Sequence, residues 1–150
     1  MNKQASLRTW AVRWTYAAIA GHLVVGLALP WLADAALLAG YHRAIETSFW
    51  GAQPPAAVHA AQVWWISLFG PTVQAAAVWM GALAYMGDRQ RSAFAWGALI
   101  AGLLLWAPQD MLVSLRQDCW DHVVIDAVAL AMLLPPLVFL FLADRRVVAS

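Results

Sequence analysis

Residues 56–87 read AAVHAAQVWWISLFGPTVQAAAVWMGALAYMG, a stretch that contains no Asp, Glu, Lys or Arg. A helix needs about 20 apolar residues to cross the roughly 30 Å of hydrocarbon in a bilayer. This stretch is therefore long enough for one membrane span. Three more apolar stretches meet the same requirement, so the expected spans are residues 12–33, 56–86, 92–114 and 120–143. The sequence predicts an all-α, integral membrane four-helix bundle that forms a single transmembrane domain over residues 1–150.

The composition agrees with a chain that lies mostly in lipid. Hydrophobic residues make up 63% of it and charged residues 11%, and the mean hydropathy is +0.66. A soluble domain carries about 25% charged residues, so this chain has too little charge to cover a surface in water. It has no basic run that could follow a phosphate backbone, which excludes a nucleic-acid partner. The single cysteine, Cys119, excludes an internal disulfide and a multi-cysteine metal site.

The segment between the first two spans has its own pattern. Within residues 34–50, the apolar side chains Tyr41, Ile45 and Phe49 recur at four-residue spacing. This spacing predicts a short amphipathic interfacial helix that lies on the membrane surface. Residues 87–91, GDRQR, are expected to form a tight charged turn between the second and third spans. The chain is also tryptophan-rich, with ten tryptophans, which favour membrane–water interfaces.

The basic residues near the span ends predict the orientation. Only Arg43 and Arg116 lie on one side of the predicted bundle, whereas seven basic residues flank the spans on the other side: Lys3, Arg8, Arg13, Arg89, Arg91, Arg145 and Arg146. The side richer in Lys and Arg is normally cytoplasmic. We therefore expect a multi-pass protein of the cell inner membrane with both termini cytoplasmic. Ala33-Asp34-Ala35 also resembles a signal-peptide cleavage site, and cleavage there would leave three spans.

Polar residues inside the predicted spans gather in the outer half, and the cytoplasmic half offers nothing comparable. Ionisable groups are costly in hydrocarbon, so they usually face protein or a water-filled cavity. By depth, His22 and Asp126 are close enough for a contact, directly or through water. The sequence thus predicts an outward-facing polar cavity whose ligand-binding residues are His22, Gln74, Asp110, His122, Asp126, Trp65 and Trp106. Each of these residues also has a simpler explanation, as helix-packing contact, cap or lipid-facing belt residue.

A carboxylate and an imidazole between tryptophan walls suit a lipid-soluble small molecule with one polar or cationic end, such as a quinone, a sterol-like molecule or an amine. No metal is predicted, and the cofactor is left unknown. A bis-histidine haem is disfavoured because His22 and His122 differ in depth by about half a leaflet. Asp118, His122 and Asp126 extend along the helix too far for one ion. A mononuclear site of His22, His122 and Asp126 stays open.

Two other functions remain open. The chain could be a non-catalytic accessory subunit of a larger membrane complex, or pair with another membrane protein or a second copy of itself as a homodimer. A stripe of small and polar residues in the second span would allow such close packing: Ser67, Gly70, Pro71, Gln74 and Gly81. Alternatively, the chain could be a membrane isomerase or redox enzyme that uses Asp/His proton transfer. The sequence leaves open whether the protein is an enzyme.

The span pattern and two segments carry a resemblance. Ser67-Leu68-Phe69-Gly70-Pro71 and Trp106-Ala107-Pro108-Gln109-Asp110, together with size and span count, resemble the small four-helix bacterial membrane proteins of the DoxX and BphX type. A fainter likeness is to sterol-isomerase and sigma-2-receptor-like bundles, whose membrane pockets hold acidic residues and aromatics. These likenesses imply a four-helix membrane topology and no particular substrate.

Overall fold

The computed structural model describes residues 3–148, which are helical apart from short connections. The elements are α1 (Lys3–Leu32), the short 3-10 helix η1 (Ala36–Leu38), α2 (Ala39–Trp50), α3 (Ala56–Gln90), α4 (Ala93–Leu115) and α5 (Trp120–Val148). Each of the four long helices contains a stretch that is long and apolar enough to cross a membrane. The prediction of an all-α chain with four such helices is confirmed. A helix also lies within the predicted interfacial segment, but its position on a membrane surface stays a prediction.

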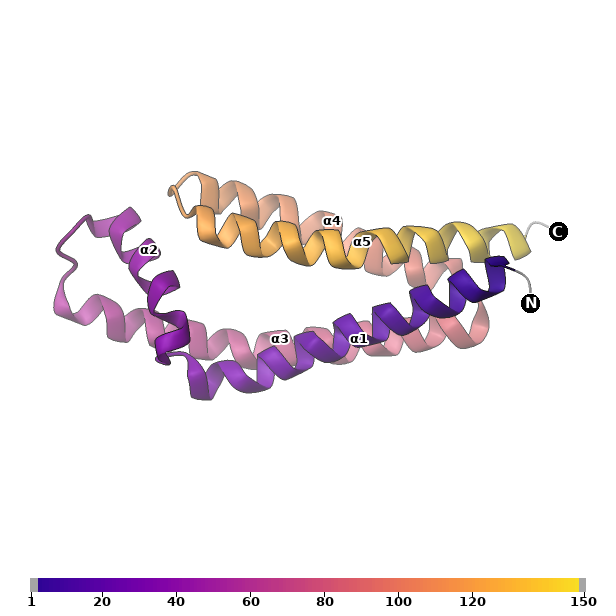
Figure 1. Cartoon of the computed structure of the whole chain (residues 1–150), viewed down its shortest axis with the longest axis horizontal. Helices are drawn as coiled ribbons and strands as arrows, with labels where there is room; N and C mark the ends of the chain where they lie inside the picture. The colour runs from indigo at the N-terminus through magenta and orange to yellow at the C-terminus, as the bar shows by residue number, and fades with distance from the viewer. Residues whose placement is uncertain (1–2, 149–150) are drawn as a thin grey trace.

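The four long helices form two pairs, α1 with α3 and α4 with α5 (Figure 1). The pairs meet at the end that carries the start of α1 and the end of α5. From there they diverge towards the end that carries α2, which lies across the gap between them (Figure 1). We call these the closed end and the open end of the molecule. The start of α1 and the end of α5 both lie at the closed end (Figure 1).

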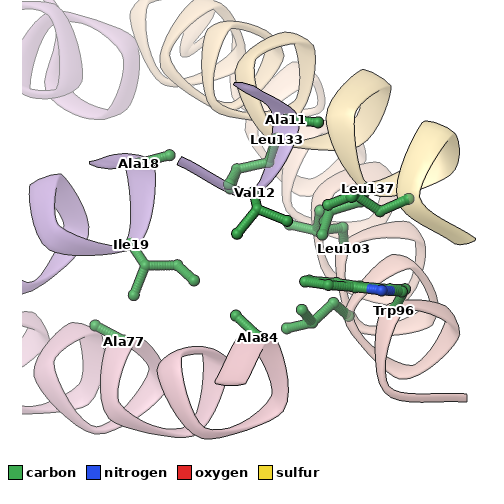
Figure 2. Close-up of a cluster of buried hydrophobic side chains, with 12 residues drawn as sticks. Ala11, Val12, Ala18, Ile19, Ala77, Ala84, Trp96, Leu103, Leu133 and Leu137 are labelled. Atoms are coloured by element: carbon green, nitrogen blue, oxygen red, sulfur yellow. The ribbon is translucent and has the colours of Figure 1, made fainter. Parts of the chain in front are cut away.

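The hydrophobic core lies towards the closed end. All four long helices contribute to it, as Figure 2 shows, and its buried members are Ala11, Val12, Ala18, Ile19, Ala77, Ala84, Trp96, Leu99, Leu103, Leu133, Leu137 and Leu140. They come from residues 11–19 of α1, residues 77–84 of α3, residues 96–103 of α4 and residues 133–140 of α5. Close packing of these side chains stabilises the closed end by dispersion attraction. The cluster does not extend to the open end.

A close crossing joins α1 to α3. A Cβ atom added to Gly70 would lie 2.5 Å from Cδ of Pro30 and 2.8 Å from the carbonyl oxygen of Gly26. Only glycine therefore fits at position 70 without a shift of the neighbouring helix. The Gln74 side-chain amide then donates to the Gly26 carbonyl at 3.0 Å. Part of the small-residue stripe in the second span is thus used for packing within the chain.

The turn between α3 and α4 is shorter than the sequence predicts. The helix continues through residues 87–90, and Arg91, which caps its end, has a left-handed backbone conformation with φ 52°. Gly87 lies inside α3 instead of in the turn, and a side chain does not fit there because a Cβ atom would lie 2.5 Å from the Trp96 ring. Ser92 then starts α4 by accepting a hydrogen bond from the backbone N–H of Ala95 at 3.3 Å.

Candidate functional site

Three of the predicted site residues converge at the open end. The Nε2 atom of His122 lies 3.5 Å from Oδ2 of Asp110 and 3.9 Å from Oδ2 of Asp126. A short connection makes α4 and α5 an antiparallel hairpin, which places the last turns of α4 beside the first turns of α5. His122 and Asp126 share a helix face because they are four residues apart. One possible metal-ligand atom from each of the three residues lies within 4.8 Å of the others, so these side chains could also surround a cation. We call these three residues the outer acidic cluster.

Tyr41 belongs beside this cluster, although its sequence context suggested only an apolar helix face. Its hydroxyl oxygen lies 2.7 Å from Nδ1 of His122. Because an ionised carboxylate only accepts hydrogen bonds, the His122 proton belongs on Nε2, and the Tyr41 hydroxyl then donates to Nδ1. Burial, with smaller effects of Cys119, Asp126 and Asp110, raises the pKa of Tyr41 to about 12. The phenol therefore stays protonated and can keep donating at neutral pH.

Asp126 is the most unusual member of the cluster. Its residue exposure is 2%, and its Oδ2 atom has no hydrogen-bond partner in the part of the chain that the structure describes. Asp110 is better satisfied, because Trp106 donates to its Oδ2 atom at 3.0 Å. A buried carboxylate with a free oxygen beside an imidazole is suited to exchange a proton. Asp126, His122 and Tyr41 provide the groups for such an exchange.

A separate cleft lies between α1 and α5, with a volume of about 440 Å³. Its walls are mostly apolar and are formed by Trp14, Ala17, Ala18, Gly21, His22, Val25, Ile125, Ala129, Met132 and Leu133. The Trp14 indole N–H is already used, since it donates to the Met132 carbonyl at 2.8 Å. His22 is therefore the polar side chain that the cleft can offer to a ligand.

The protonation of His22 follows from its own helix. Its Nδ1 atom lies 2.9 Å from the carbonyl oxygen of Ala18, one turn earlier in α1. A carbonyl only accepts, so Nδ1 carries the proton. In the neutral ring, Nε2 then keeps a lone pair that can accept a hydrogen bond. The cleft thus combines an apolar trough with one acceptor nitrogen.

The remaining predicted site residues are not brought into the outer acidic cluster. Within residues 3–148, no hydrogen bond or ion pair joins His22 to Asp126, although the sequence suggested such a contact. Gln74 is occupied by the Gly26 carbonyl. Trp65 is 57% exposed and packs edge-on against Trp64, with 5.2 Å between the ring centroids. The structure therefore divides the predicted site into two places. Trp106 lies with the outer acidic cluster and His22 lies in the cleft, whereas Gln74 and Trp65 belong to neither.

A buried charged network also lies at the closed end, formed mainly by charged residues just beyond the ends of the predicted spans. At the closed end, the side chain of Asp144 is fully buried and accepts from Nε and Nη2 of Arg8 at 3.0 and 2.9 Å. It also accepts from Nε1 of Trp96 at 2.9 Å and lies 3.4 Å from Nη1 of Arg91. Arg8 in turn donates to Oδ1 of Asp88 at 2.9 Å. This network joins α1, α3, α4 and α5, and its donors and acceptors satisfy one another.

The sequence could not reveal this network. Arg8 and Asp144 are 136 positions apart, and each lies near a span end, where charged residues normally set orientation. Both carboxylate oxygens of Asp144 are already paired, so none is free for a ligand. We therefore assign the network a structural role. It is not a candidate site.

No protein-family model, curated protein or solved structure matches this chain. The cleft and the outer acidic cluster are therefore the features from which a function is inferred.

Proposed function

We propose that the protein binds a small lipid-soluble molecule in the cleft between α1 and α5. The observation that carries this proposal is a cleft of about 440 Å³ with apolar walls and one available polar side chain, His22. Ligand sites of about 300–1,000 Å³ with few polar groups are typical for small molecules. Because His22 Nε2 accepts, the ligand's polar end would donate a hydrogen bond. A sterol-like alcohol, a quinol or an amine has this chemistry.

The proposed setting is the cell inner membrane, crossed four times, with both termini cytoplasmic. Large apolar side chains on the outside of the molecule support a lipid environment, since Trp31, Leu37 and Phe94 are 86%, 87% and 81% exposed. In this orientation the closed end is cytoplasmic and the open end is periplasmic. The cleft residues Val25 and Ile125 are about half exposed, which would let a ligand enter from the bilayer. The likeness to DoxX-type proteins stays a prediction.

Two glycine substitutions provide a matched test. A Cβ atom at Gly21 would meet nothing within 4 Å, and the same holds for Gly102 on α4. Gly21 lines the cleft and Gly102 does not. Gly21→Leu should therefore fill the cleft without a clash at Cβ, whereas Gly102→Leu makes the same change elsewhere. The wild type and both variants would be purified in mild detergent, extracted with organic solvent and analysed by mass spectrometry.

We expect a molecule that co-purifies with the wild type and with Gly102→Leu but is depleted from Gly21→Leu. His22→Leu should also deplete it, because that variant removes the acceptor and keeps the wall apolar. Equal amounts of the same lipids in all four samples would contradict the proposal. Obligate co-purification with other membrane subunits would instead favour an accessory role.

A second function, proton transfer on a small molecule bound at the outer acidic cluster, is favoured by the unpartnered Oδ2 atom of buried Asp126. In this case Asp126→Asn would keep the ligand but stop its conversion. The extracted molecule would then differ between the wild type and the variant in chromatographic retention but not in mass, as expected for an isomerisation. An identical molecule in both samples would exclude this function.

A further inference from the structure

A third group of polar side chains lies where α2 meets the start of α3, and the sequence pattern singled out none of its members as a site. His42 and Glu46 are one turn apart on α2, and His59 is in the first turn of α3. One possible metal-ligand atom from each side chain lies within 4.8 Å of the others. We propose that His42, Glu46 and His59 bind a divalent transition-metal ion of the zinc type. This inference is independent of the proposed function, since none of the three residues lines the cleft.

His42 provides the first argument. The residue is 2% exposed, and its Nε2 atom lies 2.7 Å from the carbonyl oxygen of Ala33. That carbonyl only accepts, so Nε2 carries the proton and Nδ1 of the neutral ring has a lone pair. Nδ1 is buried and has no partner among the residues that the structure describes. A buried acceptor without a donor is unfavourable, and a bound cation would satisfy it.

His59 provides the second argument, because it lies between two carboxylates. Its Nδ1 atom is 2.9 Å from Oε1 of Glu46, and its Nε2 atom is 2.9 Å from Oδ1 of Asp34. An ion bound by Nδ1 would displace the proton there, while the N–H at Nε2 would continue to donate to Oδ1 of Asp34. Metal-binding histidines commonly donate their other ring N–H to a carboxylate or a backbone carbonyl. Asp34 would hold His59 in this way, and the Ala33 carbonyl already holds His42.

The distances and ligand types indicate which ion would fit. Zinc lies about 2.0–2.2 Å from nitrogen and oxygen ligands, so two ligands in a tetrahedral site are about 3.4 Å apart. The separation of 2.9 Å between His59 and Glu46, and the 4.8 Å limit for the whole group, are within small side-chain movements of this value. Imidazole nitrogens favour zinc and its transition-metal neighbours over magnesium or calcium. Three protein ligands leave a fourth position for water.

The position of the site explains how an ion could reach it and what it would do to the fold. The His59 and Asp34 side chains are 48% and 72% exposed, so the site opens to solvent. The ligands and their partners belong to three segments: the connection after α1, helix α2 and the start of α3. A bound ion would therefore fix α2 to the α1–α3 pair. Because Tyr41 of α2 contacts His122 of α5, this would also stabilise the bridge across the open end.

The test uses the full-length protein, purified in detergent and stripped of metal with a chelator. Zinc chloride would be titrated against a chromogenic chelator, and cobalt(II) absorbance would report the ligand geometry. We expect one zinc per chain and a higher melting temperature with zinc. His59→Gln and Glu46→Gln should each weaken binding at least about 100-fold, and Asp34→Asn about 10- to 100-fold. His59 is half exposed, so its replacement should leave the helices intact.

His122→Gln is the matched control, because it removes a histidine from the outer acidic cluster instead. It should leave zinc affinity unchanged within about twofold. Zinc affinity that falls with His122→Gln but not with His59→Gln would overturn the proposal and place the ion at the other cluster. A wild-type protein that binds no zinc, or the same affinity in the wild type and His59→Gln, would also overturn it. None of these outcomes depends on whether the cleft binds a ligand.

Discussion

Arg8→Met tests whether the buried charged network holds the closed end together. Methionine keeps an apolar stem of similar length in α1 but removes the guanidinium. Asp144, whose side chain is fully buried, then loses the two N–H donors at 3.0 and 2.9 Å. It retains Trp96 Nε1 at 2.9 Å and the more distant Arg91 at 3.4 Å. The variant therefore leaves a buried carboxylate with half of its donors.

The expected loss of stability follows from these contacts. Hydrogen bonds to charged groups contribute about 1.5–3 kcal/mol each. Removing one partner of a buried ion pair costs about 3–5 kcal/mol. Because Trp96 and Arg91 still donate to Asp144, we expect the lower part of this range, about 3 kcal/mol. Arg13 lies on the same helix and is exposed, so Arg13→Met should change the free energy of unfolding by less than about 0.5 kcal/mol.

The measurement is unfolding in mixed micelles by titration with SDS, followed by tryptophan fluorescence. Wild type, Arg8→Met and Arg13→Met would be compared at one detergent composition. A third variant, Arg8→Met with Asp144→Leu, replaces the pair by apolar side chains and should recover more than half of the loss. Equal stability of Arg8→Met and Arg13→Met would refute the role assigned to this network.

Three other changes have defined outcomes in the same assay. Gly70→Ala should cost about 1–3 kcal/mol because its Cβ would lie 2.5 Å from Pro30, whereas Gly81→Ala, with its nearest contact at 3.9 Å, should cost nothing. Ser92→Ala removes the cap of α4 and should cost about 1 kcal/mol. Tyr41→Phe should cost about 1 kcal/mol at neutral pH through loss of its hydrogen bond to His122. In the folded protein the pKa of Tyr41 is raised to about 12. The extra free energy of unfolding of the wild type over Tyr41→Phe should therefore be complete below about pH 10, the pKa of an unfolded tyrosine, and should disappear as the pH rises through 12. A difference that does not change with pH would contradict this.

The sequence was sufficient for the helices and for part of the site. Length and apolarity are local properties, so the four long helices were predictable, and so was a helix within residues 34–50. The outer acidic cluster could also be predicted from the sequence. Asp110, His122 and Asp126 lie on either side of one short connection, and a helical hairpin brings such residues together.

The tertiary structure alone decided which polar groups meet. Arg8 pairs with Asp144, 136 positions away, and Tyr41 pairs with His122, 81 positions away. Residue spacing in the sequence does not predict contacts between residues so far apart along the chain. Gly87 suggested a turn, yet it lies within α3, where the Trp96 ring occupies the space that a side chain would need. His42 and His59 come together only because α2 folds back over the start of α3. Hydropathy determines which segments form spanning helices, whereas packing between helices determines which of their charged and polar side chains become neighbours.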